Sequence, residues 1–362
     1  MEVSIKISVI IPVYNGERYI ERCLDLLNKQ NFSENWEIIM IDDASIDKSK
    51  EIIKKSKLQN LKLFSLIKNS GQSAARNLGI SNAKGEYIYM QDVDDLISSD
   101  SLNTLYKIAK NNESDFVFSD FQRVENSNNQ REGTFNYDTD INFNYDQITK
   151  AMFRELHDPT LGHLGLFGCN GRLIKRSILQ ENKILFEEKL RLMEDKIFGW
   201  NVLSFCKNAF YVRKQLYAYY VYPNINTALT DSLNYGFTLS SVKLILSHIT
   251  RSLKRRNLTN NEVEKYSKQG LIFFTIHALI SISRPMFLGK INFNKGKKIR
   301  RELIKEMIQD KEISDAIKFY IPSDKESHLI PKAIAWKSCI FIEYACNRRA
   351  KQTIKMRRSG KV

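Results

Sequence analysis

The sequence has few of the residues that mark disulfide-linked or zinc-binding proteins. It contains five cysteines, five histidines and six prolines among 362 residues. The cysteines are odd in number and widely separated, and no two have metal-ligand spacing; they are Cys23, Cys169, Cys206, Cys339 and Cys346. Disulfide frameworks and zinc modules place cysteines in even numbers or in close pairs. The pattern therefore argues against both and indicates a reducing compartment.

Long hydrophobic runs are also absent. The longest apolar stretch, Leu271–Ser283, contains His277 and is shorter than the roughly 20 residues that span a bilayer. At the N-terminus, Glu2 and Lys6 flank a short apolar run that continues into a predicted strand, which is unlike a signal peptide. We therefore expect a cytoplasmic protein, either soluble or bound peripherally to the inner face of the cytoplasmic membrane.

Two nucleotide-binding signatures are missing. No Gly-x-Gly-x-x-Gly follows the first predicted strand, and no P-loop sequence is present. These absences argue against a nicotinamide-dependent dehydrogenase and a P-loop enzyme. The chain also has no internal repeat.

Charge divides the chain into two parts. The net charge is +15, but residues 231–362 hold 27 Lys and Arg against 11 Asp and Glu, whereas the remainder holds 29 against 30. We therefore expect two domains, over 1–230 and 231–362, the second basic and helical. A strongly basic region favours an anionic partner such as phospholipid or nucleic acid. Nucleic acid is not expected, because no recognisable binding motif is present.

From residue 5 to residue 121, β-branched apolar runs alternate with stretches of helical periodicity. Short loops separate them, which predicts right-handed crossovers and an α/β fold with a mostly parallel sheet flanked by helices. The predicted strands are 5–13, 36–41, 61–67, 86–91 and 116–121, and the predicted helices are 17–29, 46–57, 72–83 and 101–110, the last capped by Asp100.

Beyond residue 121 the pattern is less regular. Residues 126–142 predict a polar loop and residues 209–221 predict two short antiparallel strands. The predicted helices of this part are 146–156, 175–181, 195–205, 238–254, 261–282, 297–309 and 331–356.

Polar clusters follow three of the predicted strands. They are Tyr14-Asn15, Asp42-Asp43 and Asp92-Val93-Asp94-Asp95. Ligands of parallel α/β sheets bind beyond the carboxyl ends of the strands. Hard carboxylate oxygens on a short loop suit Mg²⁺ or Mn²⁺. The alternative, that Asp94 or Asp95 only caps the next helix, is equally consistent with this cluster by itself.

Four segments together resemble family 2 glycosyltransferases. Residues 8–16, SVIIPVYNG, are similar to the opening strand of that family, and residues 42–47, DDASID, are similar to its DDGSxD motif. Residues 71–77, GQSAARN, match GxSxARN, and residues 92–95, DVDD, match the family's Asp-x-Asp metal motif. Four motifs in order are far more specific than one. The resemblance covers residues 5–227 and leaves the last third outside it.

The resemblance implies a GT-A fold, a Rossmann-like sheet, and inverting transfer of a sugar from a nucleoside diphosphate. It places Pro12, Tyr14 and Asn15 in the base and ribose pocket and implies that Asp43 accepts a hydrogen bond from the base. It leaves Arg76 with two roles that we weigh equally: a contact to the nucleotide, or a brace for the loop.

The same resemblance places a divalent cation, Mn²⁺ or Mg²⁺, against the two phosphates. Asp94, with Asp92 or Asp95, would hold it. Charge builds on the leaving diphosphate, so a cation there stabilises the transition state directly. The nucleotide is expected to be UDP.

A base is also required, because a sugar hydroxyl is a poor nucleophile until it loses its proton. The family places this base in a Glu-Asp pair that opens a helix, and Glu194-Asp195 fits, with Asp195 as the base. The alternative is a solvated acid favoured by the helix dipole. Upstream, Gly168–Arg176 resembles the acceptor-side segment of the family.

The sequence departs from the family at two places. Many relatives end the domain with YxYRxR, whereas residues 217–222 here are YAYYVY. These tyrosines offer aromatic faces for sugar stacking, or they belong to the core. Ala44 replaces the usual glycine, so we expect that this position does not need a positive φ.

The C-terminal region contains a basic, aromatic helical pattern. Trp336, Ile340, Phe341 and Tyr344 share one face, and Lys and Arg flank it. Such a pattern is typical of a helix on an anionic membrane surface. The alternative is that the apolar face packs on the catalytic domain.

The sequence therefore predicts an inverting, metal-dependent glycosyltransferase that uses a nucleotide-sugar donor. The acceptor is expected to be a glycan or lipid-linked hydroxyl in surface polysaccharide synthesis. The main alternative is a non-catalytic carbohydrate- or nucleotide-binding module of the same fold, which Asp94 and Asp195 argue against.

Overall fold

The computed structural model describes residues 4–126, 129–133, 138–157, 168–220, 238–289, 291–322 and 327–358. The chain forms two compact units. Unit 1 comprises residues 1–150, 164–188 and 193–223, and unit 2 comprises residues 151–163, 189–192 and 224–362. The expected boundary after residue 230 falls in a stretch outside the described residues.

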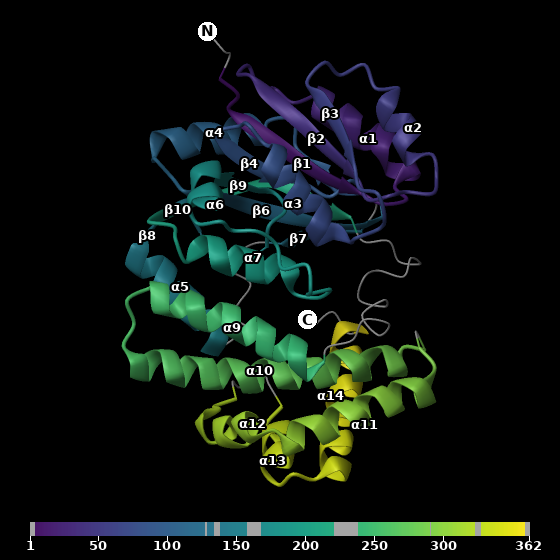
Figure 1. The fold of residues 1–362 in the computed structure, drawn as a ribbon, viewed down its shortest axis with the longest axis vertical. Helices are drawn as coiled ribbons and strands as arrows, with labels where there is room; N and C mark the ends of the chain where they lie inside the picture. The colour runs from purple at the N-terminus through teal and green to yellow at the C-terminus, as the bar shows by residue number, and fades with distance from the viewer. Residues whose placement is uncertain are drawn as a thin grey trace. The chain divides into compact units, whose positions relative to one another are not determined.

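Unit 1 is built around one mixed sheet (Figure 1), with the strand order β3-β2-β1-β4-β9-β6-β10-β5, which ends on the short strand β5 (Leu96–Ile97). Its parallel part consists of β1 (Ile7–Val13), β2 (Trp36–Asp42), β3 (Leu61–Ser65) and β4 (Tyr87–Met90). β9 (Arg172–Lys175) is antiparallel to both of its neighbours, β4 and β6 (Phe116–Asn126). The fold of unit 1 is therefore α/β, and strands β1 to β4 are parallel, as expected. The reversed strand β9 lies near the centre of the sheet.

Two expectations about the second half of the sheet are wrong. Residues 126–142 are not simply a loop, because they contribute β7 (Asn129–Gly133), paired with β6, and the start of β8 (Ile141–Asn144), paired with β10. Residues 208–220 form one strand, β10 (Asn208–Tyr220), rather than two. β10 runs parallel to β6 with a register shift between Val212 and Gln215. Lys and Arg at this bulge interrupt the apolar pattern, which explains the wrong prediction.

The helices of unit 1 lie where periodicity predicts them, with shifted ends. They are α1 (Glu17–Asn28), α2 (Ser49–Lys54), α3 (Gln72–Asn82), α4 (Ser101–Asn111), α6 (Arg176–Glu181) and α7 (Glu194–Leu203), and α5 (Tyr145–His157) begins in unit 1. α2 starts later than expected because Asp47 accepts hydrogen bonds from the Ser49 and Glu17 amides. Asp100 precedes α4, but its carboxylate pairs with Ser98 and Lys214 instead of capping the helix backbone.

The two faces of β1 bury different helices. Ile7, Val9 and Ile11 share a buried cluster with residues of α1 and α4. Ile10 points to the other face, where a Cβ on Gly79 of α3 would lie 2.4 Å from its Cγ2. Only glycine allows α3 to approach the sheet this closely. α3 is thereby held directly over the strands whose ends carry the polar clusters.

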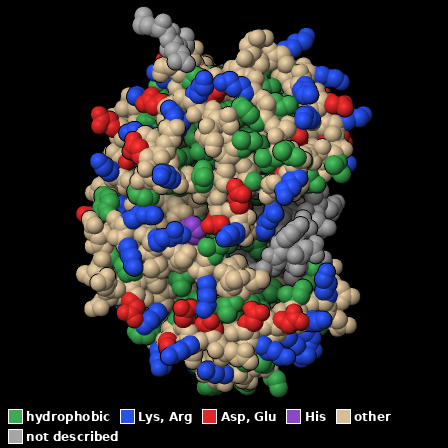
Figure 2. Space-filling view, viewed as in Figure 1, with side chains coloured by type: hydrophobic (Ala, Val, Ile, Leu, Met, Phe, Trp, Pro, Cys, Tyr) green, Lys and Arg blue, Asp and Glu red, His purple; other side chains and the backbone are tan. Residues whose placement is uncertain are grey.

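Unit 2 is helical. It contains α9 (Leu239–Arg255), α10 (Asn260–Phe287), α11 (Phe293–Gln309), α12 (Lys311–Ala316), α13 (Leu329–Ala335) and α14 (Cys339–Arg358). The single helix expected over 331–356 is wrong, because Lys337 adopts a left-handed φ of 51° and separates α13 from α14. Over the face shown in Figure 2, Lys and Arg are spread widely and mixed with Asp and Glu.

The apolar stretch Leu271–Ser283, expected to be too short to span a bilayer, is part of the longer helix α10. α10 has 28 residues and is the one described helix long and apolar enough to cross a membrane. However, 72% of its apolar window is buried within the protein. α9, α11 and α14 pack against it. A core helix of a helical unit has these properties.

Candidate active site

The acidic cluster leaves the sheet at the carboxyl end of β4. Asp92 accepts three side-chain hydrogen bonds: from Gln72 Nε2 at 3.0 Å, from Arg76 Nη2 at 2.8 Å and from Asn170 Nδ2 at 2.6 Å. Three donors on two oxygens hold this carboxylate in a single orientation. Asp92 is thus tied to the start of α3 and to the segment that precedes β9.

Asp95 is held from the opposite direction by β10. The Tyr217 hydroxyl donates to Asp95 Oδ2, and the Tyr220 amide donates to Oδ1 at 3.1 Å. Burial, followed by the charge of Asp92, raises the pKa of Asp95 to about 8. The buried Asp95 therefore anchors the loop to β10.

Asp94 differs from Asp92 and Asp95 in the hydrogen bonding of its carboxylate. Among the described residues, no other side chain donates a hydrogen bond to it, and burial and Asp92 raise its pKa to about 6. One oxygen from each of Asp92, Asp94 and Asp95 lies within 4.8 Å of the others. This donor set fits Mg²⁺ or Mn²⁺, which take carboxylate oxygens. No helix begins directly after Asp95, because the strand Leu96–Ile97 follows it, and the metal role stays a prediction.

Arg76 lies in the interior beneath the cluster. Its side chain is 2% exposed, its Nη2 bonds Asp92, and its guanidinium lies 5.2 Å from the Phe186 ring centroid. Burial opposes the charge, but nearby acidic groups outweigh it and keep the pKa of Arg76 above its usual value; they are Cys169, Asp92, Glu194 and Asp195. These contacts favour the bracing role for Arg76.

Asn77, the next residue, holds the segment that leads toward the proposed base. Its Nδ2 donates to Phe186 O at 3.0 Å and to Glu188 Oε1 at 2.9 Å, while the Phe186 amide donates to Asn77 Oδ1 at 2.8 Å. The Phe186 ring stacks on Phe198 of α7, with centroids 3.9 Å apart and planes 3° apart. Phe186 is thereby placed against Arg76 and against the base-bearing helix.

Glu194 and Asp195 form the first turn of α7. Met193 precedes them with a left-handed φ of 69°, which turns the chain sharply into the helix. Burial and the adjacent Asp195 raise the pKa of Glu194 to about 7. Adjacent carboxylates, one with a shifted pKa, are typical of sites that handle protons.

Tyr219 lies on β10, the strand whose Tyr217 hydroxyl and Tyr220 amide hold Asp95. Burial, followed by four carboxylates, raises the pKa of its phenol; these are Asp92, Asp95, Asp94 and Asp195. The charges of the loop and of α7 therefore act on a single side chain. Tyr217 is 4% exposed and belongs to the core, whereas Tyr219 is 49% exposed. The alternative of a ring available for sugar stacking therefore applies to Tyr219 and not to Tyr217.

The expected nucleotide-binding residues lie at the ends of β1 and β2. Pro12 is buried, Tyr14 is half-exposed, and the exposed Asn15 accepts from the Ile46 amide through Oδ1 at 3.0 Å. Asp43 accepts from the Ser70 and Gly71 amides at 2.7 and 2.8 Å. A base contact would use the remaining lone pairs of this carboxylate.

The expectation for Ala44 is wrong. Its φ is 57°, in the left-handed region that favours glycine. Hydrogen bonds close by hold the strained turn: the Ser45 amide donates to Asp42 Oδ1 at 3.1 Å, and the Asn15 amide donates to Ser45 Oγ at 3.0 Å. The turn therefore keeps its geometry without glycine.

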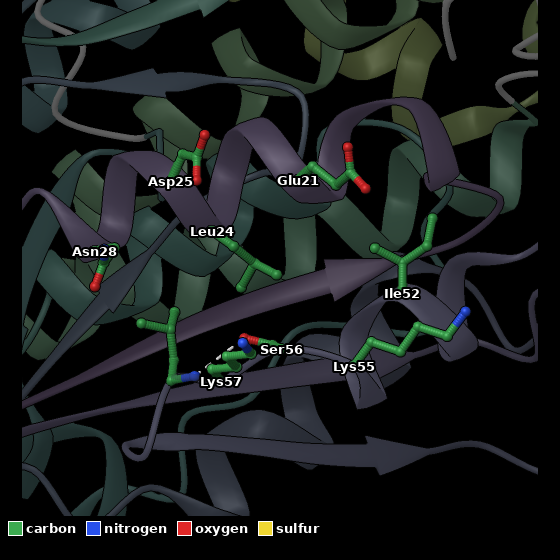
Figure 3. A pocket seen from close by; sticks show the side chains of 9 residues that line it. Glu21, Leu24, Asp25, Asn28, Ile52, Lys55, Ser56 and Lys57 are labelled. Atoms are coloured by element: carbon green, nitrogen blue, oxygen red, sulfur yellow. Dashed lines mark hydrogen bonds between the residues drawn. The ribbon is translucent and has the colours of Figure 1, made fainter.

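A hollow of about 570 Å³ lies elsewhere in unit 1 (Figure 3). α1, α2 and the turn after α2 line it; its residues are Glu21, Leu24, Asp25, Asn28, Ile52, Lys55, Ser56, Lys57 and Leu58. None of these belongs to the predicted site, and the hollow lies between helices rather than at strand ends. We assign it no role.

The structure adds residues that the sequence prediction missed. Asn170 bonds Asp92, Tyr217 bonds Asp95, and Asn77 positions Phe186. Asn77 and Tyr217 lie inside segments already recognised, so their motif positions were a usable signal. Phe186 carried none, because its role depends on ring stacking across segments distant in sequence.

Comparison with known proteins agrees with this arrangement. Residues 8–182 match the family model described as Glycosyl transferase family 2. The chain is 36% identical over 203 residues to a poly(ribitol-phosphate) beta-glucosyltransferase of Bacillus spizizenii, covering 54% of this chain and 29% of the relative. It is 31% identical over 223 residues to the poly(ribitol-phosphate) beta-N-acetylglucosaminyltransferase TarP of Staphylococcus aureus, covering 60% and 63%. The chain thus spans less than two thirds of the length of either relative.

A solved structure has the same fold. The crystal structure of S. aureus TarS 1-349 in complex with UDP-GlcNAc superposes with a TM-score of 0.70 at 19% identity, covering 96% of this chain and 92% of that one. The sheet and helices define a GT-A fold with a helical C-terminal region. Residues 8–182 form a domain that matches the model of glycosyltransferase family 2.

Proposed function

We propose that this protein transfers a sugar, with inversion, from a UDP-sugar to a hydroxyl of a surface glycan. The observation that carries the proposal is a set of contacts between the β4 loop and α7: Arg76 bonds Asp92 at 2.8 Å and lies 5.2 Å from the Phe186 ring centroid. The Phe186 ring in turn stacks on Phe198 of α7, the helix that begins with Glu194 and Asp195. A site for a cation and a base within reach of one another is what the displacement of a nucleoside diphosphate by a hydroxyl requires.

The roles of the residues follow from their contacts. Pro12, Tyr14, Asn15 and Asp43 bind the nucleoside at the ends of β1 and β2. Asp94 is the principal ligand of Mn²⁺ or Mg²⁺, with Asp92 and Asp95 fixing its loop. When bound, the cation neutralises charge on the leaving diphosphate.

Asp195 removes the proton from the attacking hydroxyl. Glu194, when ionised, places a second negative charge beside the proposed base. Arg76 supplies the positive charge that lets these acids and Asp92 coexist in a buried site. Phe186 and Asn77 hold α7 at its distance from the β4 loop.

Donor and acceptor classes are supported by the relatives. The two proteins named above glycosylate poly(ribitol phosphate), and the TarS structure contains UDP-GlcNAc. We propose UDP-glucose or UDP-N-acetylglucosamine as donor and a phosphate-containing or lipid-linked surface glycan as acceptor. The enzyme works at the cytoplasmic membrane face, where such acceptors are extended.

A diphosphate-release screen tests this function. The full chain is incubated with common UDP- and GDP-sugars, with and without Mn²⁺, and UDP or GDP release is measured without acceptor. We expect metal-dependent release from one UDP-sugar. Tight nucleotide-sugar binding with no release, even with poly(ribitol phosphate) added, would favour the non-catalytic binding module instead.

A further inference from the structure

An exposed aromatic surface lies where α13 meets α14. Trp336, Ile340, Phe341 and Tyr344 are 64%, 81%, 44% and 57% exposed. The three aromatic rings lie close together: the Trp336 and Phe341 centroids are 5.5 Å apart, and the Phe341 and Tyr344 centroids are 6.4 Å apart. We name these four residues the aromatic corner. A contiguous exposed apolar group of this kind marks an interaction site.

The opposite face of α14 is already used by the core of unit 2. Ile342, Ala345, Cys346 and Ala350 are almost fully buried. The helix therefore packs through small and aliphatic residues on one side and leaves its large aromatic residues on the other. The aromatic corner is consequently not a misplaced part of the core of this unit.

The surroundings of the corner are strongly basic. Residues 327–362 contain nine Lys and Arg and one acid, Glu343. Arg301 of α11 pairs with both carboxylate oxygens of Glu343, at 2.6 and 3.2 Å, which neutralises that single negative charge. The exposed cations on α13, α14 and their junction are Lys332, Lys337, Arg348, Lys351 and Lys355.

A basic hollow on α11 is linked to α14 by the same ion pair. It measures about 330 Å³; its lining residues are Asn294, Lys297, Lys298, Arg301, Glu302 and Lys305. Arg301 belongs to this hollow, and its partner Glu343 lies on α14, the helix that carries Phe341 and Tyr344. The ion pair thus connects the helix that carries the basic hollow with the helix that carries exposed rings.

We propose that the aromatic corner and the basic hollow dock unit 2 on an anionic phospholipid surface. Aromatic side chains partition into the headgroup boundary, and clustered Lys and Arg attract anionic lipid. A soluble polyanion would satisfy the cations but would leave Ile340 and Trp336 in water. The inference deepens the proposed function by naming the surface that presents the acceptor, and it does not depend on catalysis.

Vesicle sedimentation of the full chain tests the proposal. Pure phosphatidylcholine vesicles are compared with vesicles that also contain phosphatidylglycerol, at low and high salt. We expect binding only to the anionic vesicles, weakened by salt. The variant Trp336→Ser/Ile340→Ser/Phe341→Ser and the variant Lys297→Gln/Lys298→Gln should each bind at least about tenfold more weakly, because each removes one of the two contributions.

The control is Ile67→Ser, which removes a fully exposed apolar side chain of unit 1 and should bind vesicles like the wild type. Donor hydrolysis should be the same in all variants, which separates failed docking from failed catalysis. Equal sedimentation with neutral vesicles, or wild-type binding by the corner variant, overturns the proposal. A dimer in solution that the corner variant abolishes would show that a second copy covers the corner, which also overturns the proposal. The proposal is likewise overturned if soluble poly(ribitol phosphate) displaces the protein from vesicles and binds the corner variant as well as the wild type.

Discussion

The side-chain amide of Asn77 pairs with the backbone of Phe186 as one peptide group pairs with another. Its Nδ2 donates to the Phe186 carbonyl at 3.0 Å, and its Oδ1 accepts from the Phe186 amide at 2.8 Å, although 109 residues separate the two. Phe186 in turn stacks on Phe198 of α7. A residue of the GxSxARN motif thus sets the position of the helix that begins with Glu194 and Asp195.

Asn77→Ala should lower turnover by about tenfold or more, because a shift of α7 misplaces the base, while UDP affinity changes little. Steady-state transfer kinetics and UDP titration with Mn²⁺ measure the two effects. The control is Asn82→Ala on the same helix, where the amide bonds only the Leu78 carbonyl at 2.8 Å. An equal loss of UDP binding and turnover in Asn77→Ala would indicate general damage instead of positioning.

Gly171→Ala should destabilise unit 1 and disturb the acidic loop. Gly171 has a φ of +67°, and an added Cβ would lie 2.7 Å from the Tyr217 ring, which bonds Asp95. We expect a loss of about 1–3 kcal/mol in the free energy of unfolding, since overpacking forces neighbours to move. Gly289→Ala is the matched control, because its φ is +68° and nothing lies within 4 Å of its Cβ position. If urea denaturation shows equal losses, backbone strain alone explains both and the Tyr217 contact is unimportant.

The Glu37 carboxylate should make stability depend on pH. It is buried between β1 and β3 and accepts hydrogen bonds from Ser8, Lys62 and the Lys84 amide, each at 2.7 Å. Burial opposes its charge, but these donors outweigh burial and keep its pKa below the usual 4.5. A lowered pKa stabilises the fold above pH 4.5, and this stabilisation is lost as the pH falls through the folded-state value.

Glu37→Gln should therefore cost about 1–3 kcal/mol at pH 7, with the difference from wild type shrinking at acidic pH. Urea denaturation at neutral and acidic pH measures this. Glu86→Gln removes an ion pair of exposed side chains, Glu86 with Lys110, and should change stability by less than about 1 kcal/mol. A pH-independent difference for Glu37→Gln would show that the carboxylate charge is irrelevant there.

The pH dependence of transfer should report Glu194. Burial and Asp195 raise its pKa to about 7, so it loses its proton near neutrality. Ionised Glu194 adds a negative charge at the proposed base, and turnover should rise as the pH passes through about 7. In Glu194→Gln the inflection near neutrality should disappear and the maximal rate should fall. An unchanged pH–rate profile in this variant would assign the inflection to another group.

Sequence patterns predicted the parallel β1–β4 core and its flanking helices, because buried β-branched strands and amphipathic helices have strong local periodicities. They failed for β7, β8 and β10. There, pairing with strands distant in sequence decides the structure, of β7 and β10 with β6 and of β8 with β10. A bulge at Arg213 and Lys214 also hides the alternation of β10. Helix ends shifted where side chains such as Asp47 bond backbone amides.

The roles of the site residues stay predictions, although one oxygen from each of Asp92, Asp94 and Asp95 lies within 4.8 Å of the others. Periodicity could not reveal the residues that position these carboxylates and α7. Asn170, Tyr217 and Phe186 act through contacts between segments far apart in sequence. The positive φ of Ala44 was mispredicted because neighbouring hydrogen bonds, rather than residue type, hold the turn.

The most direct measurement compares Asp94→Ala and Asp195→Asn in the same two assays. UDP affinity with Mn²⁺ is measured by calorimetry, and sugar transfer is measured by UDP release with acceptor. We predict that Asp94→Ala loses metal-dependent UDP binding and transfer together. Asp195→Asn should bind UDP like the wild type while its turnover falls by about 10²–10⁴-fold. Near-normal turnover in Asp195→Asn, or unchanged metal-dependent binding in Asp94→Ala, would contradict the division of labour between these two carboxylates.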